Sequence, residues 1–181
     1  MNTITRDPLL AIAKGVLWFL MAVLALGMGA SLLAAPLLAI FHGPASTALA
    51  EHLESVPTGP FLWAIAGILL LAALLCALLL RLFQLLKRIV DTVGEGDPFV
   101  PDNASRLTQM AWLTLAVQLV GLPMSGIGAW INALTKGQGH TDLEVIGGVD
   151  GNGLLLMLIL FILARVFRKG AQMRADLEGM V

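Results

Sequence analysis

Charged residues are scarce in this sequence. They make up 13% of its 181 residues, whereas hydrophobic residues make up 58%. Soluble domains usually carry about 25% charged residues. This deficit of charge argues against an ordinary water-soluble domain, against intrinsic disorder and against direct nucleic-acid binding. The composition therefore predicts a protein of the membrane, in contact with membrane lipids.

Reactive side chains are scarce as well. Cys76 is the only cysteine, so no internal disulfide can form, and its apolar neighbours favour a packing role. The sequence has no Cys–His pair on one side of the membrane, no Gly-rich phosphate loop and no paired carboxylates within an apolar segment. We therefore expect no catalytic residues, no cofactor and no enzymatic activity.

The histidines would be the main source of a metal site. All three fall between apolar segments, at His42, His52 and His140, with carboxylates nearby at Glu54 and Asp142. Their spacing matches no known ligand motif, so we expect no bound metal. Residues 45–56 are instead typical of a short amphipathic helix that lies on the outer surface of the membrane.

Long uncharged runs are what the sequence has in abundance. A helix needs about 20 apolar residues to cross a hydrocarbon core of about 30 Å. Three segments meet this length, and the first is too long to be the core of a signal peptide. The fourth is marginal, because Asp150 and Arg165 bound a run that rises only about 21 Å as a helix. The expected spans are about 15–41, 61–80, 110–131 and 148–167.

Basic residues are sorted along the chain. Ten of the eleven lie before the first span, in the segment 81–109 or at the C-terminal end, while Lys136 alone falls in the segments 42–60 and 132–147. The positive-inside rule makes the basic side cytoplasmic. The prediction is an all-α integral membrane protein: one domain, a four-transmembrane-helix bundle of a bacterial inner membrane with both termini cytoplasmic. The tryptophans support it by falling near the span ends, at Trp18, Trp63, Trp112 and Trp130.

Small and polar residues form one stripe on the third span. They are spaced 4, 3, 4, 3 and 4 residues apart, which places them on one helical face that we expect to point into the bundle. Helix packing is the favoured interpretation, and a polar pathway or ligand site is the alternative. Pro123 and its neighbouring glycines could kink or break this helix. The stripe comprises Thr114, Gln118, Gly121, Ser125, Gly128 and Asn132.

The segment between the second and third spans becomes amphipathic. Its basic face is typical of a helix that leaves the membrane along the inner surface and meets anionic lipid headgroups. The simpler alternative is a solvated basic helix end that suits the helix dipole. The candidate headgroup contacts are Arg81, Lys87, Arg88, Arg165, Arg168 and Lys169.

A turn rich in glycine and proline follows over residues 94–101. Asp102 or Asn103 is then a plausible N-terminal cap of the third span. Phe99, between two prolines, either offers a docking point or folds back onto the bundle end, and burial favours the second. The candidate surface for a cytoplasmic partner is Asp97, Pro98, Phe99, Asn103 and Arg106.

Two segments resemble a known family. One reads Val-Gly-Glu-Gly-Asp-Pro-Phe and then Asn-Ala-Ser-Arg-Leu, over residues 93–107, and the other reads Leu-Ala-Arg-Val-Phe-Arg-Lys-Gly, over residues 163–170. They resemble the bacterial domain-of-unknown-function family 2975 (YoaS-like) of four-span inner-membrane proteins. Members often carry an acidic residue where Arg165 stands, so no role of that position carries over. The family has no assigned catalytic residues, and its frequent genetic neighbours imply a small helix-turn-helix regulator as partner.

These observations favour a non-enzymatic regulatory or interaction protein whose cytoplasmic face binds a soluble partner. The alternative is a small transporter or channel component that uses the polar stripe of the third span. Whether the chain forms a homo-oligomer is open, because small-residue stripes also join separate chains in membranes.

Overall fold

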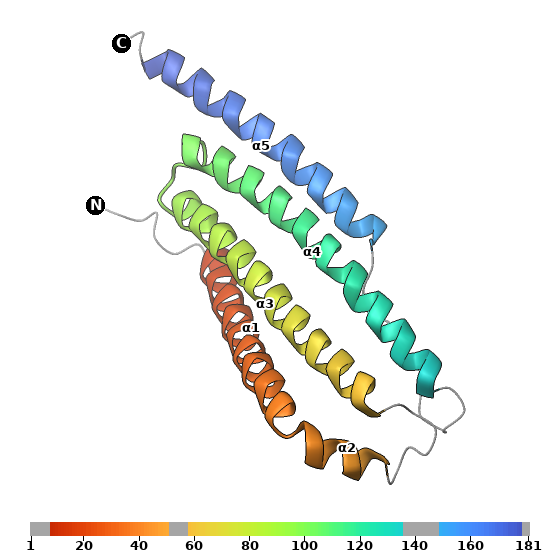
Figure 1. The fold of residues 1–181 in the computed structure, drawn as a ribbon. Helices are drawn as coiled ribbons and strands as arrows, with labels where there is room; N and C mark the ends of the chain where they lie inside the picture. Colours follow the sequence, from red (N-terminus) through yellow and green to blue (C-terminus); the bar gives the residue numbers. More distant parts are fainter. Residues whose placement is uncertain (1–7, 51–57, 136–148, 179–181) are drawn as a thin grey trace. The chain divides into compact units, whose positions relative to one another are not determined.

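A computed structural model describes residues 8–50, 58–135 and 149–178 of this protein. Within these ranges all regular secondary structure is helical, which confirms the all-α prediction (Figure 1). The helices are α1 (Pro8–Ile40), α2 (His42–Ala50), α3 (Thr58–Gly94), α4 (Pro101–Thr135) and α5 (Gly151–Glu178).

Three of the described helices, α1, α3 and α4, are long and apolar enough to cross a membrane. They contain the first three expected spans, but α3 and α4 extend well beyond them. The amphipathic stretch that begins at Arg81, predicted to leave the membrane along the inner surface, continues α3 without a break as far as Gly94. The physical reason is local, because no proline or glycine interrupts the chain between Gly67 and Gly94.

Proline has different effects at its positions in α1 and α4. Pro36 and Pro123 lie inside continuous helices, so the possible break at Pro123 does not occur. A membrane helix tolerates proline where neighbouring groups satisfy the freed backbone. Pro101 starts α4, where its fixed φ and its missing N–H are no disadvantage. Asp102 and Asn103 therefore lie in the first turn of α4, and the prediction that one of them caps this helix was wrong.

The chain divides into two compact units; α1, α3 and α4 each contribute one part to each unit, and α5 lies wholly in the first. The first, here named the α5 unit, comprises residues 1–24, 78–117 and 150–181. The second, here named the α2 unit, comprises residues 25–77 and 118–149.

Small residues set the packing in the α2 unit. A Cβ atom placed on Gly27 would lie 3.7 Å from the Cys76 Sγ, and one on Gly67 would lie 3.9 Å from Ile127 Cδ1. Cys76 is thus in contact with the adjacent helix, as expected of a packing residue. Helix α2 begins at His42, three residues before the expected amphipathic helix, and residues 51–57 lie outside the described chain.

A continuous apolar core holds the α5 unit together, with contributions from α3, α4 and α5. Helix α5 enters this core through one seam, in which Met157, Leu160, Ala164 and Phe167 are spaced 3, 4 and 3 residues apart. Such spacing keeps one face of a helix against its neighbours. The buried core residues are Leu85, Ile89, Leu107, Met110, Ala111, Leu160 and Ala164.

The remaining faces of the helices are exposed although they are apolar. On α5, Leu155, Leu158 and Ile162 are all about half exposed. The four tryptophans are exposed as well: Trp18, Trp63, Trp112 and Trp130. A water-soluble protein rarely exposes such a surface, whereas a lipid environment covers it at no cost.

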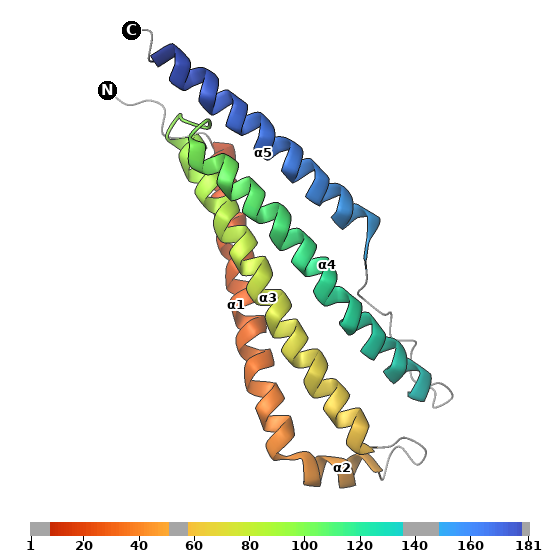
Figure 2. The same ribbon diagram turned by 45° about the horizontal axis from the view of Figure 1, so that its top comes forward.

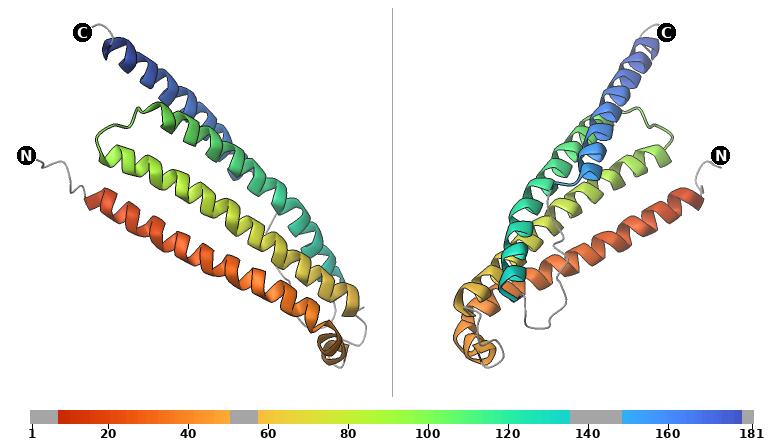
Figure 3. Two further views of the ribbon diagram at one scale, coloured as in Figure 1. Left: turned by 60° about the vertical axis from the view of Figure 1, so that its left-hand side comes forward. Right: turned by 90° about the vertical axis from the view of Figure 1, so that its right-hand side faces the viewer.

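Four helix ends meet at one end of the α5 unit. The start of α1, the end of α3, the start of α4 and the C-terminal end of α5 lie there together (Figures 2 and 3). The contacts that join them are described next, and we call this region the charged end.

Candidate functional site

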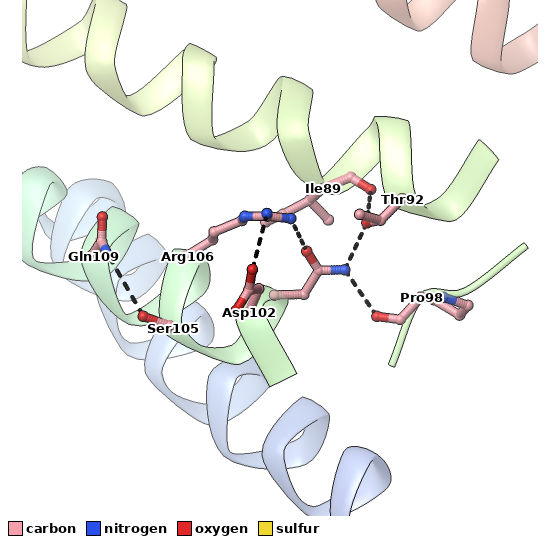
Figure 4. Close-up of polar contacts among 8 residues, drawn as sticks. Ile89, Thr92, Pro98, Asp102, Ser105, Arg106 and Gln109 are labelled. Atoms are coloured by element: carbon pink, nitrogen blue, oxygen red, sulfur yellow. Dashed lines mark hydrogen bonds and ion pairs between the residues drawn. The ribbon is translucent and has the colours of Figure 1, made fainter. Parts of the chain in front are cut away.

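The Asn103 side chain organises the charged end. It is fully buried, and its amide nitrogen donates to the Thr92 hydroxyl at 2.8 Å and to the Pro98 carbonyl at 3.0 Å. Its amide oxygen accepts a hydrogen bond from Arg106 at 2.8 Å. Thr92 donates onward to the Ile89 carbonyl at 2.8 Å, and Figure 4 shows these bonds. One buried amide thus joins the end of α3, the turn and the start of α4, because each of its groups needs a partner away from water.

The turn itself is formed by backbone bonds and one special glycine. The Gly96 N–H donates to the Val93 carbonyl and the Asp97 N–H donates to the Thr92 carbonyl, both at 3.1 Å. Gly96 has a φ of 87°, in the left-handed region that suits glycine after a helix end. The chain therefore reverses within a few residues and directs Asp97 and Phe99 toward α5.

Phe99 folds back onto α5. Its ring centroid lies 5.4 Å from that of Phe167. It also covers Gly170, where an added Cβ would lie 2.7 Å from the Phe99 Cδ1 atom. The structure thus favours the folded-back interpretation of Phe99, although 41% of the residue stays exposed. The two segments that carry the family resemblance are in direct contact here.

Ion pairs tie the remaining helices to the charged end. Arg174 of α5 pairs with Asp97 of the turn. Lys14 of α1 lies 2.8 Å from Asp91 of α3, and Lys87 lies 3.0 Å from the same carboxylate. The hydrogen bond from Lys14 lowers the pKa of Asp91, Lys87 lowers it further, and burial partly opposes the change. Asp91 therefore stays ionised near neutral pH and joins α1 to α3.

A groove of about 470 Å³ runs between α4 and α5 at the charged end. Ala171 and Ala175 lie one turn apart on α5 and open the groove, because they have no long side chain to fill it. Its lining surface is mostly apolar, with polar groups from Ser105, Thr108, Gln109, Arg168 and Gln172 among it. The lining residues are Pro101, Ala104, Ser105, Thr108, Gln109, Arg168, Ala171, Gln172 and Ala175.

The predicted partner surface is brought together, but much of it is engaged within the chain. Asp97 and Phe99 contact α5, and Arg106 bonds to Asn103 and lies 3.5 Å from Asp102. Asn103 has no exposed area, so its predicted place on a partner surface is corrected to a place inside the fold. The reason is that the turn needs a buried hydrogen-bonding group at this position.

The predicted headgroup residues divide into two kinds. Lys87 is partly buried, pairs with Asp91 and lies 5.8 Å from the Trp18 ring, so it is engaged within the chain. Lys87 and Asp91 lie four residues apart on α3, a spacing at which opposite charges meet on one helical face. The others are exposed: Arg81, Arg88, Arg165, Arg168 and Lys169.

The polar stripe of α4 has the features of a packing surface. Thr114 and Gln118 are buried, and the rest of the stripe, Gly121, Ser125, Gly128 and Asn132, is half-buried. The Thr114 hydroxyl donates to the Met110 carbonyl and the Ser125 hydroxyl donates to the Leu122 carbonyl, both at 2.9 Å. These hydroxyls bond to their own helix and so need no ligand.

Sequence reasoning missed several contributors to the charged end. Lys14, Asp91 and Arg174 were not singled out, and only the Lys87–Asp91 spacing of four residues could have indicated an ion pair. The histidines give no further site within the described chain. His42 packs on Trp63 at 5.6 Å between ring centroids. The residues from which a metal site could have been drawn lie outside the described chain: His52, Glu54, His140 and Asp142.

Three helices of membrane-spanning length with exposed apolar faces are typical of an α-helical membrane protein. The chain belongs to the family described as protein of unknown function (DUF2975), whose family model matches residues 44–181. The resemblance seen in the two short segments is thereby confirmed. No curated protein and no solved structure matches the chain.

Contact between Phe99 and Gly170 predicts a non-additive pair of substitutions. Alanine in a helix is normally more stable than glycine by about 1 kcal/mol. In Gly170→Ala this gain should be offset, because the new methyl group displaces the Phe99 ring. In a Phe99→Ala background the gain should return, giving a coupling of about 1 kcal/mol in a double-mutant cycle of unfolding in detergent. Gly126→Ala, which has open space around it, is the control that should gain stability in both backgrounds.

The lowered pKa of Asp91 predicts a pH-dependent contribution to stability. The ion pairs stabilise the fold above the ordinary carboxyl pKa and are lost as the pH falls through the lowered value. We expect wild type to be more thermostable than Asp91→Asn near pH 7, with the difference shrinking below about pH 4. Asp102→Asn, at an exposed carboxylate, should differ little from wild type throughout. A difference for Asp91→Asn that is constant from pH 7 to pH 3 would contradict the proposed role of this pair.

Proposed function

We propose that this protein is a non-enzymatic interaction protein of a bacterial inner membrane, with four spans, and that its charged end binds a soluble protein. The observation that carries this proposal is the groove between α4 and α5 at that end. The membrane part of the proposal rests on the three long apolar helices and on the exposed apolar faces of α5.

Helix α5 is proposed as the fourth span. Its uncharged part, residues 151–164, rises about 21 Å, which is shorter than the hydrocarbon core. The long side chains of Arg165 and Arg168 can reach the interface and so extend the usable length. Because Leu155, Leu158 and Ile162 of α5 are more than half exposed, the apolar face that they form needs lipid around it.

The groove suits a protein segment for two reasons. Alanines at one-turn spacing leave room for side chains of a partner, and serine, threonine and glutamine side chains at the rim offer it hydrogen bonds. The groove is held in shape by Asn103 and by the Phe99 contact, so a partner meets a preformed surface, which lowers the entropic cost of binding. Family analogy proposes a small helix-turn-helix regulator as the partner.

Transport through the α4 stripe has less support. The described hydroxyls of the stripe bond within their own helix, which is the arrangement expected of a packing seam.

Topology is tested first. Reporter fusions or single cysteines placed at Ser55 and Gly139 should report the outer side, and those at Glu95 and Val181 should report the cytoplasm. Cys76→Ser provides the cysteine-free background. If Val181 is outside while Glu95 is inside, α5 does not cross and the four-span proposal fails.

Partner binding is tested by filling the groove. The full chain is captured from native membranes after cross-linking, and the recovered proteins are identified by mass spectrometry. Ala175→Phe should lower recovery of a specific partner at least about tenfold. The reason is that the phenylalanine ring fills the space in which the partner would make a central contact. Ala11→Phe is the matched control on an exposed position of α1. Equal recovery with both variants, or no specific partner, would contradict the proposal.

A further inference from the structure

A second hollow lies beside the groove and has a different chemistry. It encloses about 710 Å³ and shares Thr108, Arg168 and Gln172 with the groove. Arg165 and Lys169 belong to this hollow alone, and Phe161 and Ala164 form its apolar part.

Positive charge in the hollow is not neutralised by the described chain. No carboxylate lines the hollow, and among the described residues Arg165, Arg168 and Lys169 form no ion pair. The three cations lie within five consecutive residues of one helix and repel each other. An anion that bound among them would relieve this repulsion and receive charge-assisted hydrogen bonds.

The hollow lies at the level where the helices change from apolar to charged. Arg165 is the first charge after the apolar run of α5, and Arg81 is the first charge after that of α3. Phe161 packs edge-on against Trp112 of α4 at 5.7 Å between centroids. Trp112 in turn lines a small recess together with Arg81. Arginine and tryptophan at one level are typical of the headgroup region of a bilayer.

An apolar track leads to the hollow along α5. Leu158, Ile162, Arg165 and Lys169 are spaced 4, 3 and 4 residues apart and so share one helical face. Leu158 and Ile162 are more than half exposed. A ligand on this face would therefore meet apolar side chains on one side and cations on the other, which is the division found in a phospholipid.

We propose that this hollow binds the phosphate group of an anionic phospholipid, with the acyl chains along Leu158 and Ile162. The guanidinium of Arg165 and the ammonium of Lys169 are the main phosphate donors, and Arg168 and the Gln172 amide complete the site. The inference rests on the proposed membrane orientation of α5 but not on the protein partner.

The test uses the purified full chain in phosphatidylcholine nanodiscs. Phosphatidylglycerol is added in steps, and its retention is measured by native mass spectrometry together with thermal stability. We expect the double variant Arg165→Gln with Lys169→Gln to weaken phosphatidylglycerol retention roughly tenfold or more. The reason is that each substitution removes one charge contact with the lipid phosphate. Arg88→Gln removes an exposed charge of α3 that lines neither the hollow nor the Trp112 recess, and should weaken it less than about twofold. Replacement by the other cation, as Arg165→Lys with Lys169→Arg, should keep most of the retention and shows that the site is intact.

Three results would overturn the proposal. A loss with Arg88→Gln as large as that with the Arg165 and Lys169 double variant would show a general surface potential and no site. Equal retention of phosphatidylcholine would show that the negative charge is not recognised. Competition by inorganic phosphate at the same concentration as the lipid would show a site for soluble phosphate. The groove variant Ala175→Phe should leave lipid retention unchanged, so failure of the partner proposal is distinguishable from failure of this one.

Discussion

The buried side chain of Asn103 is the interaction on which the charged end depends. An amide away from water must satisfy its donors and its acceptor, and here the partners come from α3, from the turn and from α4. This requirement fixes the turn between the two helices. Once the turn is fixed, Phe99 and Asp97 contact α5, and the groove and the basic hollow arise where α5 passes α4.

The two short segments that suggested the family thus have a structural explanation. Gly96 reverses the chain, Phe99 fills the space that Gly170 leaves open, and Asn103 holds the turn. Residues that seem suited to an external partner are needed within the fold. The surfaces left for other molecules lie beside the motifs, where Ala171 and Ala175 leave space and where Arg165 and Lys169 leave charge without a carboxylate.

Much of the fold could be predicted from the sequence, but the extent of its helices could not. Runs of uncharged residues predict the three long apolar helices because burial in lipid depends on composition over about 20 residues. Composition does not predict where α3 ends, because the helix continues beyond residue 80 although its hydropathy falls. Continuation depends on helix-forming residues and on packing of Leu85 and Ile89, which composition does not report. The start of α4 was misplaced for a similar reason, since Pro101 and not a polar cap begins it.

The sequence by itself determined that this is a helical membrane protein of its family, because hydropathy and short motifs are properties of local sequence. Only the tertiary structure decided which polar residues are internal. Lys14 and Asp91 are 77 positions apart, and Asp97 and Arg174 are equally distant, yet each pair is in contact. Spacing within one helix cannot predict such pairs, because they depend on which helices are neighbours and at what level. The arrangement of neighbouring helices likewise decides that Asn103 is buried and Arg165 exposed. It also decides where the groove and the hollow form.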